Sequence, residues 1–143
     1  MKPRKRSKKS RHQSAKKKLD EVFSRWIRLK DADRNGYCTC VTCGKFDHWK
    51  KMQAGHYVSR LYMATRWVPE NVHVQCLSCN LFKKGAMDEY ALFIISKYGQ
   101  EQLEKLNMAK KRTAKFHSYD LEAMIKVYER ELDNLQGGTT CSS

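Results

Sequence analysis

The chain has 143 residues, 41% of them hydrophobic, and carries a formal net charge of +14 with a pI near 9.7. This length suits one domain with tails, and the charge favours a polyanionic partner, of which nucleic acid is the commonest. No run of about 18 apolar residues predicts a membrane span, and the basic N-terminus lacks the apolar stretch of a signal peptide. We therefore expect a cytoplasmic protein, in which clustered cysteines bind metal more often than they form disulfides.

Residues 1–18 form a strongly basic segment with ten Lys or Arg and no Asp or Glu. Such a segment has almost nothing to bury and its charges repel one another, so it is expected to be disordered. We interpret it as an arm that binds phosphates through counterion release. A tail that only increases solubility is the alternative.

Residues 19–33 are expected to be helical, because apolar side chains recur there at helical spacing. The turn signal Asn35-Gly36 follows and ends the element. The aromatic pair in this helix is interpreted as core rather than as a platform for stacking bases. The apolar positions are Leu19, Val22, Phe23, Trp26 and Ile27.

Three more helices are predicted toward the C-terminus, over residues 88–98, 100–109 and 119–135, with Gly99 ending the first of them. The basic connector 110–117 precedes the last helix. The last helix is amphipathic, and its apolar stripe could pack inside the monomer or join two copies. Residues 19–136 are taken as a single domain and residues 137–143 as a disordered tail. The stripe consists of Leu121, Met124, Ile125, Tyr128, Leu132 and Leu135.

Four of the six cysteines form two Cys-x-x-Cys pairs, Cys40 with Cys43 and Cys76 with Cys79. Two such knuckles supply four thiolates, which suits a closed tetrahedral zinc site. Cys38 could replace Cys40 as a ligand, although it would make a longer knuckle with Cys43. Cys141 is interpreted as a bystander. Cys43 and Cys76 are 33 positions apart, which leaves room for a functional insert.

The insert and the second knuckle carry a His-Asn-Asn series. His56 lies in a predicted short strand, Asn71 and His73 follow in PENVHVQC, and Asn80 comes directly after Cys79. Zinc knuckles around a strand histidine, with a helix starting at the second knuckle, describe a ββα-metal hairpin in a treble-clef scaffold. The predicted fold class is therefore α+β and mainly helical.

The stretches CVTCGK, AGHY, NVHVQCLSCNLFKKG and, more weakly, KFHSYDLEAMIKVYERELDNL resemble the HNH endonucleases in their His-Asn-Asn form, of which phage endonuclease VII is an example. The chain is most similar to the lambdoid phage NinG (Rap) recombination family. This resemblance implies a structure-specific nuclease that acts on branched DNA recombination intermediates.

His56 is the candidate general base, because a neutral imidazole near pH 7 can take a proton from water; a buried structural histidine is the alternative. In the resembled fold Asn80 starts a helix and its amide oxygen binds Mg²⁺ or Mn²⁺; a helix N-cap is the alternative. Asn71 is expected to tie the loop that orients the histidine strand; an ordinary turn asparagine after Pro69 is the alternative. His73 could bind metal, orient a phosphate or simply pack.

The sequence departs from the endonuclease VII pattern at Gly55, where those proteins place a metal-binding aspartate before the histidine. Glycine offers no side-chain ligand, so a second ligand would have to come from elsewhere. The AGH sequence is interpreted as a trait of NinG-like proteins. The candidates for the second ligand are Gln53, Asp47, His48 and His73.

Basic residues near these motifs are candidates for contacts with the DNA backbone. Aromatic residues among them could insert into a junction, although core packing is the expected role. The basic candidates are Lys83, Lys84, Arg60, Arg66, Lys110, Lys111, Arg112 and Lys115, and the aromatic residues are Tyr57, Tyr62 and Trp67.

The sequence therefore predicts a Mg²⁺- or Mn²⁺-dependent endonuclease with structural Zn²⁺ that cuts Holliday junctions or related branched DNA. A homodimer is expected, since symmetric resolution of a junction takes two active sites. The alternatives are a zinc-stapled nucleic-acid-binding module without catalysis and a general HNH nuclease without junction preference. The resemblance also implies a phage protein in the cytoplasm of the host cell.

Overall fold

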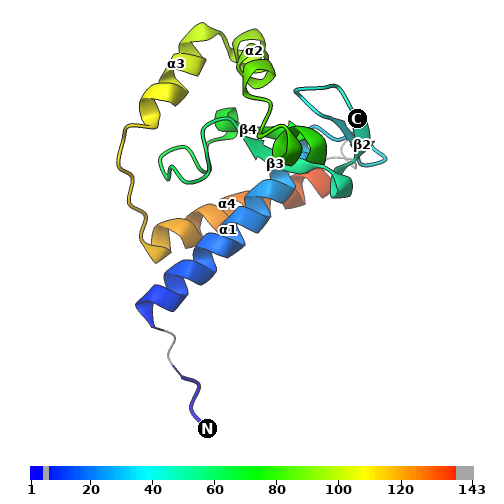
Figure 1. Cartoon of the computed structure of the whole chain (residues 1–143). Coiled ribbons are helices and arrows are strands. Elements are labelled where there is room, and N and C mark those ends of the chain that lie inside the picture. The colour runs from blue at the N-terminus through cyan, green and yellow to red at the C-terminus, as the bar shows by residue number, and fades with distance from the viewer. Residues whose placement is uncertain (5–6, 138–143) are drawn as a thin grey trace. The chain divides into compact units, whose positions relative to one another are not determined.

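The computed structural model describes residues 1–4 and 7–137, which form a mixed α/β fold that is mainly helical (Figure 1). The chain divides into two compact units, residues 1–26 with 115–143 and residues 27–114. Within residues 1–4 and 7–137, the four α-helices have 23, 12, 10 and 20 residues, whereas the four strands have three or four each. Among the described residues, no helix is both long enough and apolar enough to cross a membrane.

The first unit contains two helices, α1 (Lys8–Lys30) and α4 (Ser118–Gly137), which pack together. Only the part of α1 up to residue 26 belongs to this unit. The two helices run in the same direction, because Arg11 pairs with Glu122 and Phe23 packs on Tyr128 further along both helices. Their apolar stripes face each other and exclude water. The buried residues of this unit are Ala15, Leu19, Val22, Phe23, Leu121 and Ile125.

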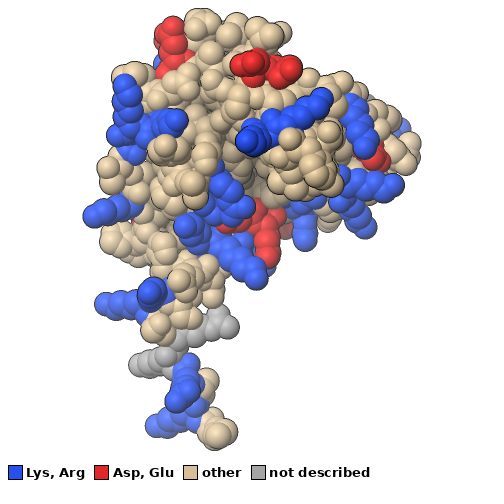
Figure 2. All heavy atoms as spheres, viewed as in Figure 1, with Lys and Arg blue, Asp and Glu red and all other residues tan. Residues whose placement is uncertain are grey.

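α1 begins at Lys8, inside the segment that the sequence analysis expected to be disordered. The Ser7 hydroxyl accepts a hydrogen bond from Ser10 N–H at 3.2 Å, as an N-cap does. Arg11 makes a bidentate pair with Glu122, with both N···O distances 2.8 Å. Ala15 extends the apolar stripe by one turn before Leu19. These contacts hold the basic segment in a helix, and Figure 2 shows Lys and Arg without Asp or Glu at the N-terminal end of the chain.

The apolar stripe of α4 packs inside the chain, which is one of the two roles expected for it. The Tyr128 ring lies 4.9 Å from Phe23 and 5.0 Å from Trp26, measured between ring centroids. Phe23 is 2% exposed, so its predicted role in the core is confirmed. The tail predicted for residues 137–143 lies outside the described residues, apart from Gly137, which ends α4.

The second unit contains two antiparallel hairpins, β1 (Tyr37–Thr39) with β2 (Phe46–His48) and β3 (Gln53–His56) with β4 (Val72–Gln75). The first knuckle forms the turn between β1 and β2, and the second begins directly after β4. In the β3–β4 pair, Gly55 faces His73 and His56 faces Val72. Because side chains alternate across a sheet, Gly55 and His73 share one face and His56 lies on the other.

Two helices complete the second unit, α2 (Met87–Tyr98) and α3 (Gln100–Ala109), as predicted. Gly99 joins them with φ of +94°, a conformation that favours glycine. One core cluster unites both helices with the loop that follows β3. Its buried members are Val58, Tyr90, Ile94, Leu103 and Leu106.

Candidate metal centre and active site

The two knuckles bring Cys40, Cys43, Cys76 and Cys79 together, as their spacing predicted. Their four Sγ atoms all lie within 4.8 Å of one another, and Cys43 Sγ lies 3.6 Å from Cys76 Sγ. A tetrahedral site with Zn–S bonds of about 2.3 Å has S···S edges of about 3.8 Å. Cys38 is buried in β1 outside this cluster, and Cys141 lies outside the described residues. The cluster could therefore hold one zinc ion.

The chemistry of the cluster also fits a bound cation. Burial acts to raise the Cys40 pKa, but the Thr42 hydroxyl and nearby backbone N–H groups outweigh it and lower that pKa to about 6. Burial and the neighbouring thiols raise the Cys79 pKa to about 12. Four thiolates this close repel one another unless a cation compensates their charge. Zn²⁺ would supply that charge and fix the two knuckles to each other.

His56 ends β3, and its ring is oriented by the backbone. Its Nε2 lies 2.8 Å from the Arg66 carbonyl oxygen. A carbonyl oxygen only accepts, so Nε2 carries the proton, and in the neutral ring Nδ1 carries the lone pair. Arg66 belongs to the loop that leads from β3 to β4. The loop therefore sets the tautomer of the neutral His56 ring.

Asn71 ties this loop together from a fully buried position in the 3-10 turn Pro69–Asn71. Its Oδ1 accepts from Val58 N–H at 2.7 Å, and its Nδ2 donates to the carbonyls of Val58 and Thr65 at 3.0 and 3.1 Å. One amide side chain thus satisfies three backbone groups on both sides of the loop. This is the loop-tying arrangement that the sequence analysis expected of it.

Replacing Asn71 by Ala is expected to lower the free energy of unfolding by about 3 kcal/mol or more, because three backbone groups lose their partner inside the protein. Denaturant unfolding of the zinc-loaded chain measures the change. Asn35→Ala is the matched control, since this exposed side chain is expected to contribute less than about 0.5 kcal/mol. Equal stability of both variants would contradict this account of the loop.

His73 is buried and both of its ring nitrogens contact tyrosine hydroxyls, which fits the packing role among those left open for it. Its Nδ1 lies 3.0 Å from Tyr90 Oη, and its Nε2 lies 2.8 Å from Tyr98 Oη. Burial, with Lys97 and Lys30 nearby, lowers its pKa to about 3. Tyr90 also donates to the Gly55 carbonyl at 2.6 Å. A chain of hydrogen bonds therefore runs from Tyr98 through His73 and Tyr90 to the residue before His56.

Asn80 lies inside the π-helical turn Ser78–Phe82 rather than at the start of an α-helix. The alternative role as a helix N-cap is not seen, because Leu77 is the N-cap of this turn and α2 begins later, after Ala86. Asn80 Nδ2 instead donates to Gln53 Oε1 at 2.6 Å. Gln53 starts the strand that His56 ends, about 10 Å away along it. Gln53 and His56 also lie on opposite faces of the hairpin.

The space beside Gly55 is filled by Gln75 of the neighbouring strand. A Cβ added at Gly55 would lie 1.9 Å from Gln75 Oε1. Gln75 is fully buried, and its Nε2 donates to the Gly85 carbonyl at 2.8 Å and to Thr42 Oγ1 at 3.2 Å. These bonds identify Oε1, which has no hydrogen-bond partner, as the atom facing Gly55. The site therefore does not fit a divalent cation held by an aspartate at this position.

The other candidates for a second metal ligand have other contacts. Asp47 Oδ1 accepts from His48 N–H at 2.7 Å and Asp47 forms an ion pair with Lys45 at 4.0 Å. His48 Nδ1 accepts from Lys50 N–H at 3.3 Å. Of the four candidates, Gln53 is the one that the structure brings to Asn80. Both residues are neutral amides.

The basic candidates differ in exposure. Arg66 is 6% exposed, and its Nη1 donates to the Arg60 carbonyl at 2.7 Å, so the expected surface contact with DNA does not fit its position. Trp67 is buried, as expected for a core residue. Lys110 Nζ lies 5.1 Å above the Tyr62 ring. The exposed basic residues of this unit include Lys83, Lys84, Arg60, Lys110, Lys111 and Arg112.

Sequence reasoning missed Gln75 and the two tyrosines that hold His73. Tyr90 and Tyr98 lie 17 and 25 positions after it. Because Tyr90 and Tyr98 are eight residues apart in a predicted helix, they are expected near one face of it. This spacing could have indicated that they act together. Gln75 gave no comparable signal, because its contact with Gly55 depends on the strand register.

The fold and the cluster define a small, mainly helical α/β protein built around a four-cysteine centre that could hold zinc. The family model of the bacteriophage lambda NinG protein matches residues 1–137, so the chain belongs to the NinG family. Protein ninG of Escherichia phage lambda is 27% identical over 124 residues, which cover 84% of this chain and 56% of that protein. Protein ninG of Salmonella phage P22 is 25% identical over 121 residues, which cover 84% of this chain and 57% of that protein.

The chain spans somewhat more than half the length of these relatives. Protein ninG of Escherichia phage 933W shows the same proportion, with 27% identity over 84% of this chain and 57% of that protein. No solved structure matches the chain. The family assignment therefore rests on sequence.

Proposed function

We propose that this protein is an endonuclease that cleaves branched DNA, such as Holliday junctions, on a treble-clef zinc scaffold with an HNH-like hairpin. The observation that carries the proposal is the orientation of His56 by the Arg66 carbonyl at 2.8 Å, between two cysteine knuckles. A neutral histidine with a defined lone pair is the usual requirement for a general base. The resemblance to HNH endonucleases supplies the substrate class.

In the proposed reaction His56 Nδ1 takes a proton from a water molecule. The water oxygen forms a bond to the scissile phosphorus, and the bond from phosphorus to the leaving nucleotide oxygen breaks. Asn71 maintains the loop geometry, and the hydrogen-bond chain from Tyr98 to the Gly55 carbonyl supports the strand from its other face. These residues position His56 and do not themselves contact substrate.

The resemblance also implies Mg²⁺ or Mn²⁺, which would neutralise charge on the phosphate when bound. Asn80 remains the one proposed protein ligand, with a neutral amide oxygen that suits a hard cation. Gly55 offers this ion no carboxylate, and Gln75 fills the space beside it. We also propose DNA as the partner, a homodimer as the acting form and the host cytoplasm as the location.

Cleavage of a synthetic four-way junction, beside a linear duplex of the same sequence, tests this proposal. We expect paired nicks in the junction alone with Mg²⁺ or Mn²⁺. His56→Gln keeps a donor for the Arg66 carbonyl but no comparable base, so cleavage should fall by about 10²–10⁴-fold while junction binding persists. His117→Gln, at an exposed histidine, is the matched control and should cleave normally.

Two outcomes would change the assignment. Equal cleavage of junction and duplex would indicate a general HNH nuclease. Binding without cleavage in either metal would favour the second candidate function, a zinc-stapled nucleic-acid-binding module. The observation that favours this second candidate is the filling of the space beside Gly55 by the Gln75 amide, where a catalytic carboxylate would otherwise lie.

A further inference from the structure

The second knuckle presents an apolar tip to solvent, which we define as Leu77, Leu81 and Phe82. These side chains are 43%, 58% and 79% exposed, whereas Cys79 between them is 1% exposed. The Cys79 side chain is therefore buried, whereas the three apolar side chains around it face solvent. Contiguous exposed apolar groups contribute nothing to folding and commonly mark an interaction site.

The backbone holds this tip in an uncommon conformation. Ser78–Phe82 is a π-helical turn, closed by a hydrogen bond of 2.9 Å from Lys83 N–H to the Ser78 carbonyl. Gly85 N–H also donates to the Cys79 carbonyl at 2.8 Å. Single π-turns are rare and occur frequently at functional sites. The cysteine cluster and the Asn80–Gln53 bond fix the same turn, so the tip is ordered before any partner arrives.

The chain leaves the tip through a strained turn. Lys84 and Ala86 have φ of +52° and +47°, in the left-handed region that residues with a Cβ seldom adopt. Gly85 between them has φ of +90°. Strain of this kind persists where surrounding contacts enforce it, and it clusters at binding and catalytic sites.

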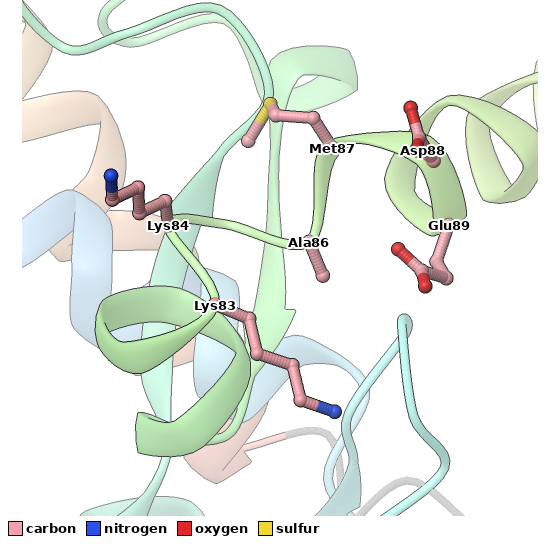
Figure 3. A pocket seen from close by; sticks show the side chains of 6 residues that line it. All are labelled: Lys83, Lys84, Ala86, Met87, Asp88 and Glu89. Carbon is pink, nitrogen blue, oxygen red and sulfur yellow. The ribbon is translucent and has the colours of Figure 1, made fainter.

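Two lysines follow the tip directly, and Figure 3 shows Lys83 and Lys84 extending in opposite directions from the turn. Both lysines line an open pocket of about 280 Å³ together with Asp88 and Glu89, so the pocket itself is not selectively basic. Lys84 extends away from the two carboxylates in the figure. The tip is therefore apolar and is followed directly by two lysines, on a chain of net charge +14.

We propose that Leu81 and Phe82 insert between bases at the branch point of a DNA junction, while Lys83 and Lys84 contact the flanking phosphates. This deepens the proposed function and rests on it for the choice of DNA. Phe and Leu are among the side chains that wedge between base steps, and lysine binds phosphate as a point charge. A continuous duplex must be unstacked to admit them, whereas a branch point already interrupts the stack. Insertion would therefore favour junctions over duplexes.

The experiment uses a four-way junction with 2-aminopurine at the branch point and a linear duplex with the same label. The His56→Gln chain is titrated in without added divalent cation, so that cleavage does not interfere. We expect 2-aminopurine fluorescence to rise on the junction and not on the duplex. Adding Phe82→Ala should remove most of the rise and weaken junction binding by about tenfold or more, with duplex binding unchanged.

Phe46→Ala in the same background is the matched control, since Phe46 is 61% exposed and lies on β2 outside the tip. Zinc content and thermal unfolding show whether each variant is folded. An unchanged fluorescence rise with folded Phe82→Ala would overturn the proposal. Loss of self-association in that variant, with the fluorescence unaffected, would also overturn it and assign the tip to a second copy of the chain. The experiment measures insertion and not cleavage. A protein that binds junctions without cutting them would therefore still give the expected fluorescence rise.

Discussion

Cys76→Ser is expected to release zinc and to unfold residues 27–114 at physiological temperature. Two-stranded hairpins with strands of three or four residues are marginal by themselves, and the four-cysteine cluster joins the two hairpins of this unit. Structural zinc sites contribute about 10–16 kcal/mol of apparent binding free energy, which is comparable to the whole stability of a domain, about 5–15 kcal/mol. Losing one ligand should therefore remove the cooperative unfolding transition.

Metal content per chain and thermal unfolding followed by circular dichroism measure this effect. A strong chelator added to the unchanged chain should reproduce it. Cys38→Ser is the matched control, because Cys38 is 3% exposed but lies outside the cluster. We expect this control to retain one zinc ion and to lose stability only modestly. Zinc loss in the Cys38 variant with retention in the Cys76 variant would show that the ligand set is wrong.

Local patterns predicted the parts of this fold that depend on short-range sequence. Helical periodicity found α2, α3 and α4 to within a residue or two, because each helix carries a regular apolar stripe. Cys-x-x-Cys spacing found the cluster, because a knuckle is a local turn. Gly55 departs from the endonuclease VII pattern in the sequence itself, but its close approach to Gln75 depends on the strand register.

The remaining features depend on residues that are distant in the sequence. The basic N-terminal segment is helical because Ala15 and Leu19 are buried along its apolar stripe and Arg11 pairs with Glu122, 111 positions away. Composition alone does not reveal such distant partners. Asn80 departs from its expected place because the chain after Cys79 forms a π-turn and not an α-helix. Arg66 was counted as a surface cation, but its guanidinium is satisfied by a nearby carbonyl inside the loop.

Gly55→Asp is expected to prevent folding or to lower the free energy of unfolding by more than about 4 kcal/mol. The added Cβ would lie 1.9 Å from Gln75 Oε1 and 2.6 Å from its Cδ. Gln75 cannot move aside freely, because its Nε2 is held by Gly85 and Thr42 in the interior. The new carboxylate would also face an amide oxygen that has no partner, and burying an unpaired charge is costly.

A double-mutant cycle with Gln75→Ala separates this collision from a general intolerance at position 55. Gln75→Ala alone should cost about 1–3 kcal/mol, since the Gly85 carbonyl loses its donor. The double variant Gly55→Asp with Gln75→Ala should be more stable than Gly55→Asp alone, because removing the Gln75 side chain opens the space beside position 55. Urea unfolding of the zinc-loaded variants measures the free energy of unfolding of each. Equal destabilisation with and without Gln75 would contradict the steric account. If the double variant also binds Mn²⁺ more tightly than the unchanged chain, measured by electron paramagnetic resonance, then Gln75 occupies the place that a carboxylate ligand would take.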